Sequence, residues 1–404
     1  MGTEPWCTLL GGGAAAPDRA AFFNGALVRY LDYNDAFLAP GETCHPSDML
    51  GALLAAGEHG HARGRDLLTG LAVAYQVQCR LSEAAPLRQR GFDHTVQETY
   101  ACAAGASRVL NMTAGETAHA VSIAGTALNA LRVARTGRLS NWKGLAGPFA
   151  CAGALEAVFL AKSGVTGPLE VFEGSRGFME SMSGPFSLDW RKEGLEIVGR
   201  TLMKKYNAEI HSQSAVEALL QIRSSAGFGA RDVDRIEVDI FDVAYDIIGG
   251  GEEGPKRDVH TKEEADHSLP YILAVALLDG TVSPAQYAPA RIASPDVHAL
   301  MRRIRIHPDP AFSLAFPDAM PCRVTAVLLD GRRFEVVKKD YEGFPTRPLP
   351  DRAVRDKFGA LGRDRLDRLQ MDSIAGCVDE LERLPVRALI HELEGVRLPA
   401  RRPA

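Results

Sequence analysis

From residue 47 to about residue 165, the chain repeats apolar side chains at the spacing of an α-helix. One run extends from Asp48 to Glu58 and follows Ser47, a residue type that commonly caps helices. A second run extends from Asp66 to about Leu81. Alanine and glycine are abundant in these runs, so we expect the helices to approach one another closely. The pattern predicts a packed all-helical domain.

Two capping-box motifs mark further helix starts. Thr-x-x-Glu at 113–116 opens an apolar run to about Val133, and the same motif at 261–264 opens a run to about Leu278. The threonine hydroxyl and the glutamate carboxylate of such a motif satisfy backbone N–H groups that a helix start leaves unpaired. We therefore expect a helix to begin at each motif.

Past residue 200 the pattern changes. Val233 to Phe241 alternates apolar and charged residues in the manner of a half-buried strand. The segments 323–329 and 333–338 flank Asp330-Gly331, a dipeptide that favours a hairpin turn. From Asp351 onward, charged amphipathic helix returns.

These patterns predict a mainly α fold with an α+β part. We expect a large all-helical domain that starts at residues 1–202, a smaller α+β lid domain at 203–345, and returning C-terminal helices at 346–404. The active site is expected in the cleft between the two domains.

Composition limits the possible partners and the compartment. The net charge of −5 argues against nucleic acid, because phosphate binding requires a basic surface. No segment approaches the roughly 20 uninterrupted apolar residues of a membrane helix, and the N-terminus lacks a secretory signal. The seven cysteines are scattered without a Cys-x-x-Cys pair, which argues against disulfides and against cysteine-based zinc or iron–sulfur sites. A reducing, cytoplasmic setting is expected.

Polar residues gather in five clusters, each of which could be a site or a solvated turn or helix end. They cover 29–48, 90–95, 132–144, 204–214 and 266–271. The candidate site residues within them are Arg29, Asp32, Asn34, His45, Asp93, His94, Lys143, Lys204, Lys205, His211, His267 and Tyr271. The fourth cluster lies where the helical pattern ends, which is where a cleft between domains would form.

Two other kinds of site are poorly supported. Glu58-His59-Gly60-His61 has metal-ligating residue types, but no third ligand lies near it in the sequence. The Gly-x-Ser-x-Gly motif of a serine hydrolase is not found between a strand and a helix. We expect no metal and no cofactor.

In this order, the clusters resemble the MmgE/PrpD family. The similar segments are Ala21–Ala26, Arg29–Asp35, His45–Asp48, Gly91–His94, Trp142–Gly144, Lys204–Glu217, Asp266–Tyr271 and the 310–340 region. The chain departs from the family at Asn207, where many members have proline. The resemblance implies a metal-independent dehydratase that acts on a citrate-like tricarboxylate, with 2-methylcitrate as the best match. It also implies a homodimer, the usual state in the family.

By position, the resemblance implies active-site roles for five residues: Asp32, His45, Lys143, Lys204 and Tyr271. In dehydration, a proton leaves a carbon beside a carboxylate, so nearby cations stabilise the charge that develops. Lys143 and Lys204, helped by Arg29 or Lys205, suit that role. Proton transfer requires His or Asp near neutral pH. The candidates for base and acid are His45, His94 and Asp32, and Tyr271 could orient or protonate the leaving hydroxyl.

The remaining candidates, which are Arg29, Asn34, Asp93, Lys205, His211 and His267, are expected to bind substrate. Two alternatives stay open. One is a decarboxylase or epimerase of a related di- or tricarboxylate, which would use the same side chains. The other is a shortened, non-catalytic paralogue that binds a ligand or partner, because fold resemblance alone does not determine function.

Overall fold

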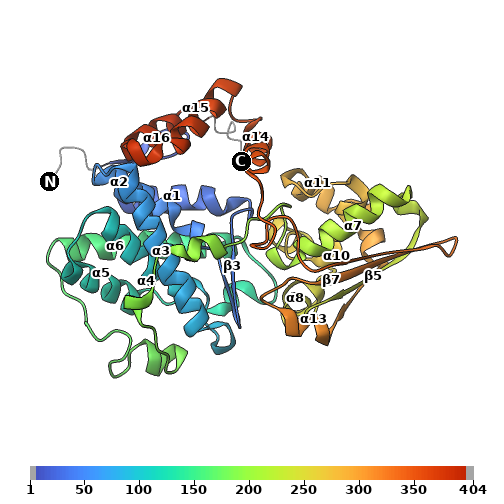
Figure 1. The fold of residues 1–404 in the computed structure, drawn as a ribbon, viewed down its shortest axis with the longest axis horizontal. Helices are drawn as coiled ribbons and strands as arrows, with labels where there is room; N and C mark the ends of the chain where they lie inside the picture. Colours follow the sequence, from blue (N-terminus) through green and yellow to red (C-terminus); the bar gives the residue numbers. More distant parts are fainter. Residues whose placement is uncertain (1–5, 397–404) are drawn as a thin grey trace.

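A computed structural model describes residues 6–396 of the chain. The helical part occupies one side of the molecule and the α+β part the other (Figure 1). The six helices that begin the helical part are α1 (Pro17–Tyr30), α2 (Leu50–His59), α3 (Gly64–Ala84), α4 (Thr95–Val109), α5 (Ala114–Ala127) and α6 (Ala146–Lys162). This arrangement confirms the predicted fold class. No helix within residues 6–396 has the length and apolarity required to cross a membrane.

Glycines allow the helices of this part to approach one another closely. A Cβ atom on Gly51 of α2 would lie 2.3 Å from the backbone nitrogen of Gly25 in α1. A Cβ atom on Gly105 of α4 would lie 2.7 Å from the carbonyl oxygen of Gly70 in α3. Any side chain at these two crossings would force the helices apart, so the abundance of glycine translates into tight packing.

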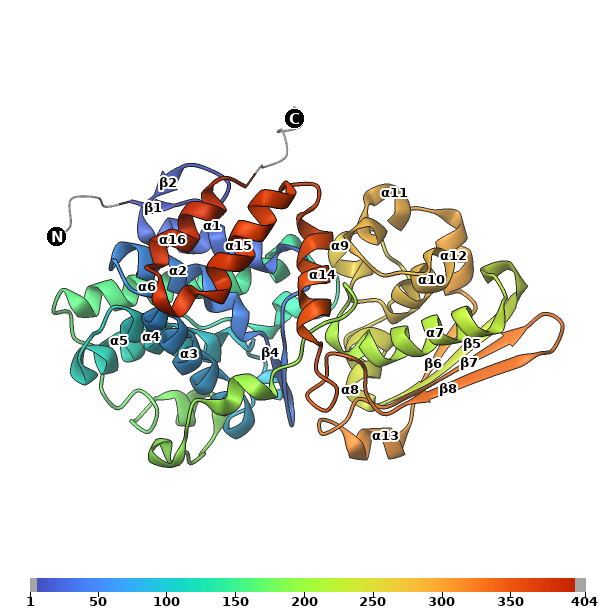
Figure 2. The same ribbon diagram turned by 45° about the horizontal axis from the view of Figure 1, so that its top comes forward.

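The α+β part is built on a four-stranded sheet in the order β6-β5-β7-β8. Its strands are β5 (Val233–Ile240), β6 (Ile304–Pro308), β7 (Cys322–Leu328) and β8 (Arg333–Lys338). Only β5 and β6 are parallel, and β7 and β8 form the hairpin predicted at Asp330-Gly331. The two longest helices of this part, α7 (Gln213–Ala226) and α10 (Leu269–Asp279), pack against the sheet (Figure 2). The shorter helices are α8 (Asp242–Ala244), α9 (Lys262–Ala265), α11 (Pro289–Ile292), α12 (Pro295–Met301) and α13 (Pro310–Ala315).

The C-terminal segment returns to the helical part. It forms α14 (Asp351–Gly362), α15 (Arg368–Asp379) and α16 (Val386–Glu394), drawn in red in Figures 1 and 2. Val386, Leu389 and Ile390 of α16 join the same hydrophobic core as α2 and α6. Two short strand pairs complete the fold: β1 (Cys7–Thr8) with β2 (Ala14–Ala15), and β3 (Phe37–Ala39) with β4 (Glu42–Cys44).

Three sequence-based predictions about helices were wrong in detail. Ser47 does not cap α2, because it lies inside the 3₁₀ turn η1 (Pro46–Met49) and its hydroxyl donates to Asp35. The helix after the 113–116 capping box ends at Ala127, well before Val133, because the chain beyond it extends and pairs Leu131 with Phe92.

The third error concerns the helix predicted from 261 to about 278. It is two helices, α9 and α10, with a break at residues 266–268. Ser268 caps the second helix by accepting the backbone N–H of Tyr271 at 3.1 Å. Pro270 in the first turn of α10 has no N–H to continue the earlier helix. The break presents Asp266 and His267 outside regular helix.

Candidate active site

Asp32 lies at the centre of a cluster of buried cations. It follows the C-terminus of α1 with a φ of +52°, a left-handed conformation that few residues other than glycine adopt. Arg29 donates to its carboxylate, as do the Nζ atoms of Lys143 at 2.5 Å and Lys204 at 3.1 Å. Lys143 comes from the 3₁₀ turn η4 (Asn141–Gly144), and Lys204 comes from the segment before α7. Three distant segments thus converge on one carboxylate.

The charges in this cluster determine its protonation. Burial disfavours the ionised form of Asp32, but the positive charges of Arg29, Lys143 and Lys204 outweigh burial and hold the pKa of its carboxyl well below the ordinary value. Burial lowers the pKa of Lys143 to about 8, although Asp32 and Asp266 oppose that shift. Three cations therefore donate to Asp32, although Arg29 also pairs with Asp48 and Lys143 also lies near Asp266. A cluster with several cations suits an additional carboxylate from a ligand.

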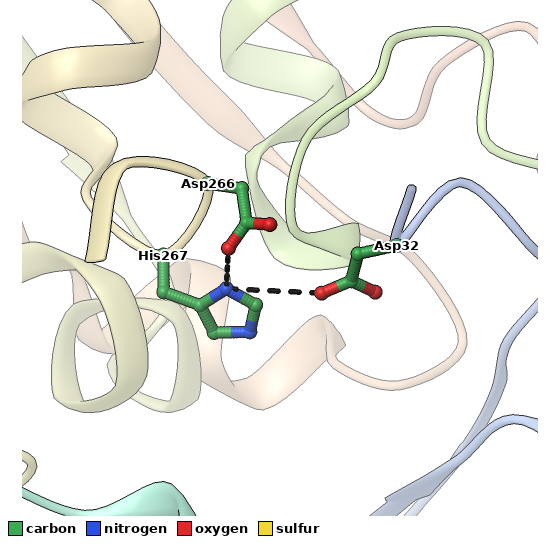
Figure 3. Close-up of side chains that lie close together, drawn as sticks. All are labelled: Asp32, Asp266 and His267. Carbon is green, nitrogen blue, oxygen red and sulfur yellow. Dashed lines mark hydrogen bonds and ion pairs between the residues drawn. The ribbon is translucent and has the colours of Figure 1, made fainter. Parts of the chain in front are cut away.

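Asp266 and His267 meet the same cluster from the α+β part (Figure 3). His267 Nδ1 lies 2.6 Å from Asp266 Oδ1 and 3.9 Å from Asp32 Oδ2. Lys262 of α9 pairs with the other carboxylate oxygen of Asp266 at 2.7 Å. Burial opposes ionisation of Asp266, but Lys143, Lys262 and His267 outweigh it, so the pKa of Asp266 is held below its usual range.

Asp32, Asp266 and His267 have the residue types of a metal site. The ammonium of Lys143 already lies among them, with Nζ 2.5 Å from Asp32 Oδ2, 3.1 Å from His267 Nδ1 and 4.0 Å from Asp266 Oδ1. A divalent ion there would have to displace this lysine. The residues fit an internal cation better than a metal.

His45 and His94 lie beside the cation cluster, on the side of the helical part. Their rings meet edge to face with centroids 5.5 Å apart. His45 Nδ1 lies 2.8 Å from the carbonyl oxygen of Asp35, so this nitrogen carries the proton and donates it. Burial, with the charges of Arg29 and Lys204, holds the pKa of His45 well below its ordinary value. The imidazole of His45 is therefore neutral at pH 7.

His94 is enclosed more completely. Its Nδ1 lies 3.2 Å from Asp93, which in turn accepts from Arg135 at 2.5 Å. Its Nε2 is buried without a hydrogen-bond partner among the described residues, and the residue lies near Asp48 and Glu98. Burial, the largest cause, lowers the pKa of His94 despite Asp93. The Asp93–His94 pair is therefore embedded in the helical part.

Asp48, His94 and Glu98 form a second group of metal-ligating residue types. Arg29 Nε lies 3.2 Å from Asp48 Oδ2 and supplies positive charge there. Burial raises the pKa of Asp48 to about 6, and burial together with Asp48 raises that of Glu98 well above its ordinary value. Glu98 therefore binds a proton more readily than an exposed glutamate does, and Arg29 supplies positive charge to this group.

Two further candidates support the site. Asn34 accepts from Arg29 at 3.0 Å and donates to Asp48 at 2.6 Å, which fixes both side chains. His211 pairs with Glu209 at 2.7 Å, and the backbone N–H of Glu209 donates to the carbonyl oxygen of Asp266.

The structure does not bring Lys205 and Tyr271 into the cluster. Lys205 pairs with Glu342 at the edge of a groove of about 1330 Å³ beside α14. Tyr271 is buried in the core of the α+β part, where its hydroxyl donates to the carbonyl oxygen of Gln286. A smaller cavity, of about 240 Å³, borders Arg29, Asp32, Lys143 and Lys262.

Lys357 binds the backbone on either side of the cluster and was not predicted from the sequence. It lies on α14, and its Nζ donates to the carbonyl oxygens of Tyr33 at 3.0 Å and Lys204 at 2.9 Å. The same Nζ lies 3.7 Å from the centroid of the Tyr33 ring. Burial lowers the pKa of Lys357 to about 8. The C-terminal helices thus hold the two backbone segments that carry Asp32 and Lys204.

Other residues that contribute to the site were also not selected from the sequence. Some of them had a clearer indication in the sequence than others. Asp266 stands next to His267, and Arg135 lies in the basic run before α6, so both were visible as polar residues near candidates. Glu209 lies in the fourth cluster, two residues before His211, and was visible in the same way. Glu98 had no signal of that kind, because it lies outside the clusters and its partner Cys151 comes from a distant segment.

Known proteins are similar to this chain over most of its length. The family model described as the MmgE/PrpD N-terminal domain matches residues 1–191, and that of the MmgE/PrpD C-terminal domain matches residues 206–382. The chain belongs to the MmgE/PrpD family. It is an enzyme of the hydro-lyase class, although identity to its named relatives is near 30%.

Three relatives of this MmgE/PrpD enzyme illustrate the similarity. The 2-methylcitrate dehydratase of Escherichia coli K12 is 30% identical over 399 residues, which cover 92% of this chain and 81% of the relative. That of Cupriavidus necator is 32% identical over 80% of this chain and 70% of the relative. The alkylcitrate dehydratase phiI of a fungal species is 29% identical over 90% of this chain and 77% of the relative.

Asn207 joins the two parts of the molecule. Its backbone N–H donates to the carbonyl oxygen of Val282 at 3.1 Å, and its Nδ2 donates to that of Leu31 at 2.7 Å. Proline could make neither bond. Leu31 directly precedes Asp32, so Asn207 ties the α+β part to the centre of the cluster.

Proposed function

We propose that this MmgE/PrpD enzyme removes water from 2-methylcitrate, or a similar tricarboxylate, to form 2-methyl-cis-aconitate. The observation that carries the proposal is the convergence of Arg29, Lys143 and Lys204 on buried Asp32. A tricarboxylate needs several cations close together to bind its carboxylates. The imidazoles of His45 and His267, whose pKa values burial lowers, lie beside these cations and can move protons. The relatives named as 2-methylcitrate dehydratases support the same substrate.

The chemistry follows from the charges. A base takes a proton from the carbon beside a substrate carboxylate, the C–H electrons form the new double bond, and the C–O bond to the hydroxyl breaks. Negative charge grows on the carboxylate as the proton leaves, so Lys204 and Arg29 lower the barrier by facing it. The departing hydroxide needs a proton. Lys143, with a pKa of about 8, is charged at pH 7 and acidic enough to supply one.

No metal is required in this scheme. A Lewis acid would otherwise polarise the leaving hydroxyl. The ammonium of Lys143, located among Asp32, Asp266 and His267, supplies positive charge at that position instead. We therefore propose side-chain acid–base catalysis without metal or cofactor.

We also propose that the enzyme is a cytoplasmic homodimer. Support for the dimer comes from large apolar side chains exposed on α1, η4 and α6, among them Tyr30, Trp142 and Phe149. Trp142 and Phe149 contact one another with ring centroids 5.4 Å apart, so they form a continuous apolar surface. Light scattering coupled to size-exclusion chromatography would measure the oligomeric state.

Purified protein incubated with 2-methylcitrate, citrate and cis-aconitate would test the reaction. A rise in ultraviolet absorbance with 2-methylcitrate, from the new conjugated double bond, is the expected result. Release of CO₂ from cis-aconitate without that rise would instead identify a decarboxylase. Racemisation of a small dicarboxylate would identify an epimerase, and folded protein without turnover would indicate a non-catalytic paralogue.

A further inference from the structure

Asp266 fixes the proton of His267 on one ring nitrogen. Asp266 is ionised and can only accept a hydrogen bond, so His267 Nδ1, 2.6 Å from its Oδ1, must be the donor. The Nζ of Lys143 lies 3.1 Å from the same Nδ1 but cannot donate to a nitrogen that already carries a proton. Lys143 donates to Asp32 at 2.5 Å instead. The remaining ring nitrogen, Nε2, therefore has a free lone pair.

That nitrogen lies on the side of the imidazole ring away from Asp266 (Figure 3). Among the described residues, no hydrogen bond to His267 Nε2 is found, and this atom is not among the fully enclosed polar atoms. The His267 side chain is 14% exposed, whereas the Asp32 and Lys143 side chains are 5% and 3% exposed. His267 is thus more open to a ligand than Asp32 and Lys143, although Lys262, with 25% of its side chain exposed, is more open still.

The other proton acceptors near the cluster are less suitable. The carboxylate of Asp32 is bound by three cations, which hold its pKa well below the ordinary value and make it a weak base. His94 lies close to Asp48 and Glu98 inside the helical part, and its Nε2 is fully buried. His45 donates Nδ1–H only to a neutral carbonyl group, so it lacks a carboxylate to stabilise the imidazolium form.

We infer that His267 Nε2 is the base that takes the proton from the substrate carbon, and that Asp266 is the positioning residue that orients the imidazole and stabilises its protonated form. In this step the C–H bond breaks, an N–H bond forms at Nε2, and the C–H electron pair becomes part of the new double bond as hydroxide departs and is protonated. The inference rests on the proposed dehydration. It assigns catalysis to a residue that the sequence suggested only for substrate binding.

The test uses the full chain and 2-methylcitrate labelled with deuterium at the carbon that loses its proton. Release of label to water reports C–H cleavage, and ultraviolet absorbance reports overall dehydration. We expect H267Q to lower both rates by about 10²–10⁴-fold with little change in KM, as for loss of a general base. Added imidazole is expected to restore part of the activity of H267A. H307Q, at an exposed histidine of the α+β part, is the matched control and should behave as the wild type.

The variant D266N tests whether Asp266 orients the His267 imidazole or only stabilises the folded site. Its amide can donate to Nδ1 and place the proton on Nε2, so kcat should fall by about as much as in H267Q, by analogy with the tautomer inversion known for serine proteases. D266E should recover activity. Binding of tricarballylate, an unreactive tricarboxylate, should remain in D266N, which shows that the site has folded.

The outcomes are distinguishable. If wild-type protein does not dehydrate 2-methylcitrate, the proposed function fails before any variant is compared. If the wild type turns over and H267Q keeps kcat and label release within about tenfold of it, His267 is not the base, because a general base contributes more than that. If D266N loses tricarballylate binding as well as activity, the role of Asp266 is structural and the orientation argument is overturned.

Discussion

Lys204 donates to both the carbonyl oxygen and the carboxylate of Asp32, at 2.7 and 3.1 Å, across 172 residues of sequence. These bonds hold Asp32 in a left-handed backbone conformation that its own segment would rarely adopt. They also join the helical part to the segment that leads into the α+β part. The same ammonium thus supports the backbone of the site and supplies charge to it.

Replacing Lys204 with methionine should therefore affect activity and stability together. We expect K204M to lower kcat by about 10²–10³-fold, because one preorganised cation is removed. It should also destabilise the fold by about 3–5 kcal/mol, since it breaks a buried ion pair. Steady-state kinetics and urea unfolding would measure the two effects. K339M, at an exposed lysine, is the control, and a K204M enzyme with normal kcat would contradict the assignment.

The structure and the family resemblance predict different roles for Tyr271, and a variant at this residue can distinguish them. Its hydroxyl donates to Gln286 within the hydrophobic core, away from the cations. We expect Y271F to keep the wild-type kcat and KM while losing about 1 kcal/mol of stability from the missing hydrogen bond. A large loss of kcat in Y271F, with normal thermal stability, would restore the catalytic role implied by resemblance.

The lowered pKa of Lys143 predicts an alkaline limit of activity. Because its pKa is about 8, Lys143 is charged below that pH and becomes neutral as the pH rises through it. The profile of kcat/KM should fall above about pH 8. K143R should be less active overall, but its decline should move to higher pH because a guanidinium stays charged.

Lys357 provides the control for that profile, since burial lowers its pKa to about 8 as well. K357R should leave the alkaline decline in place if Lys143 causes it. Should the decline shift in K357R and not in K143R, the titrating group is the lysine that supports the backbone.

Metal removal should leave the reaction intact. Lys143 Nζ already occupies the space among Asp32, Asp266 and His267, so we expect a chelator to remove no essential ion from them. We expect full activity after exhaustive dialysis against EDTA, measured by the same absorbance assay. Activity that is lost on dialysis and restored by one particular metal would refute side-chain catalysis.

Asn207 should contribute to the connection between the two parts. N207P removes the N–H that bonds to Val282 and the amide that bonds to Leu31. Each carbonyl left without its partner should cost about 1–3 kcal/mol, which denaturant unfolding would detect. N207P with unchanged stability would show that these bonds are replaced when proline is present.

Features encoded over a few residues were predicted from the sequence. Thr113 and Glu116 form the expected capping box, as do Thr261 and Glu264, and Asp330-Gly331 turns between β7 and β8. These features depend on contacts within three or four residues, so their signals are local. The candidate cations were also identifiable, because they stand in short clusters of polar residues that are costly to bury without partners.

Tertiary structure alone decided which of those residues meet. Asp32 and Lys143 are 111 residues apart, and only the packing of α1, η4 and the segment before α7 brings them together with Lys204. The sequence could not separate His267, at the break between α9 and α10, from Tyr271, four residues later and turned into the core. Residue types reveal what chemistry is available, but side-chain direction depends on long-range packing.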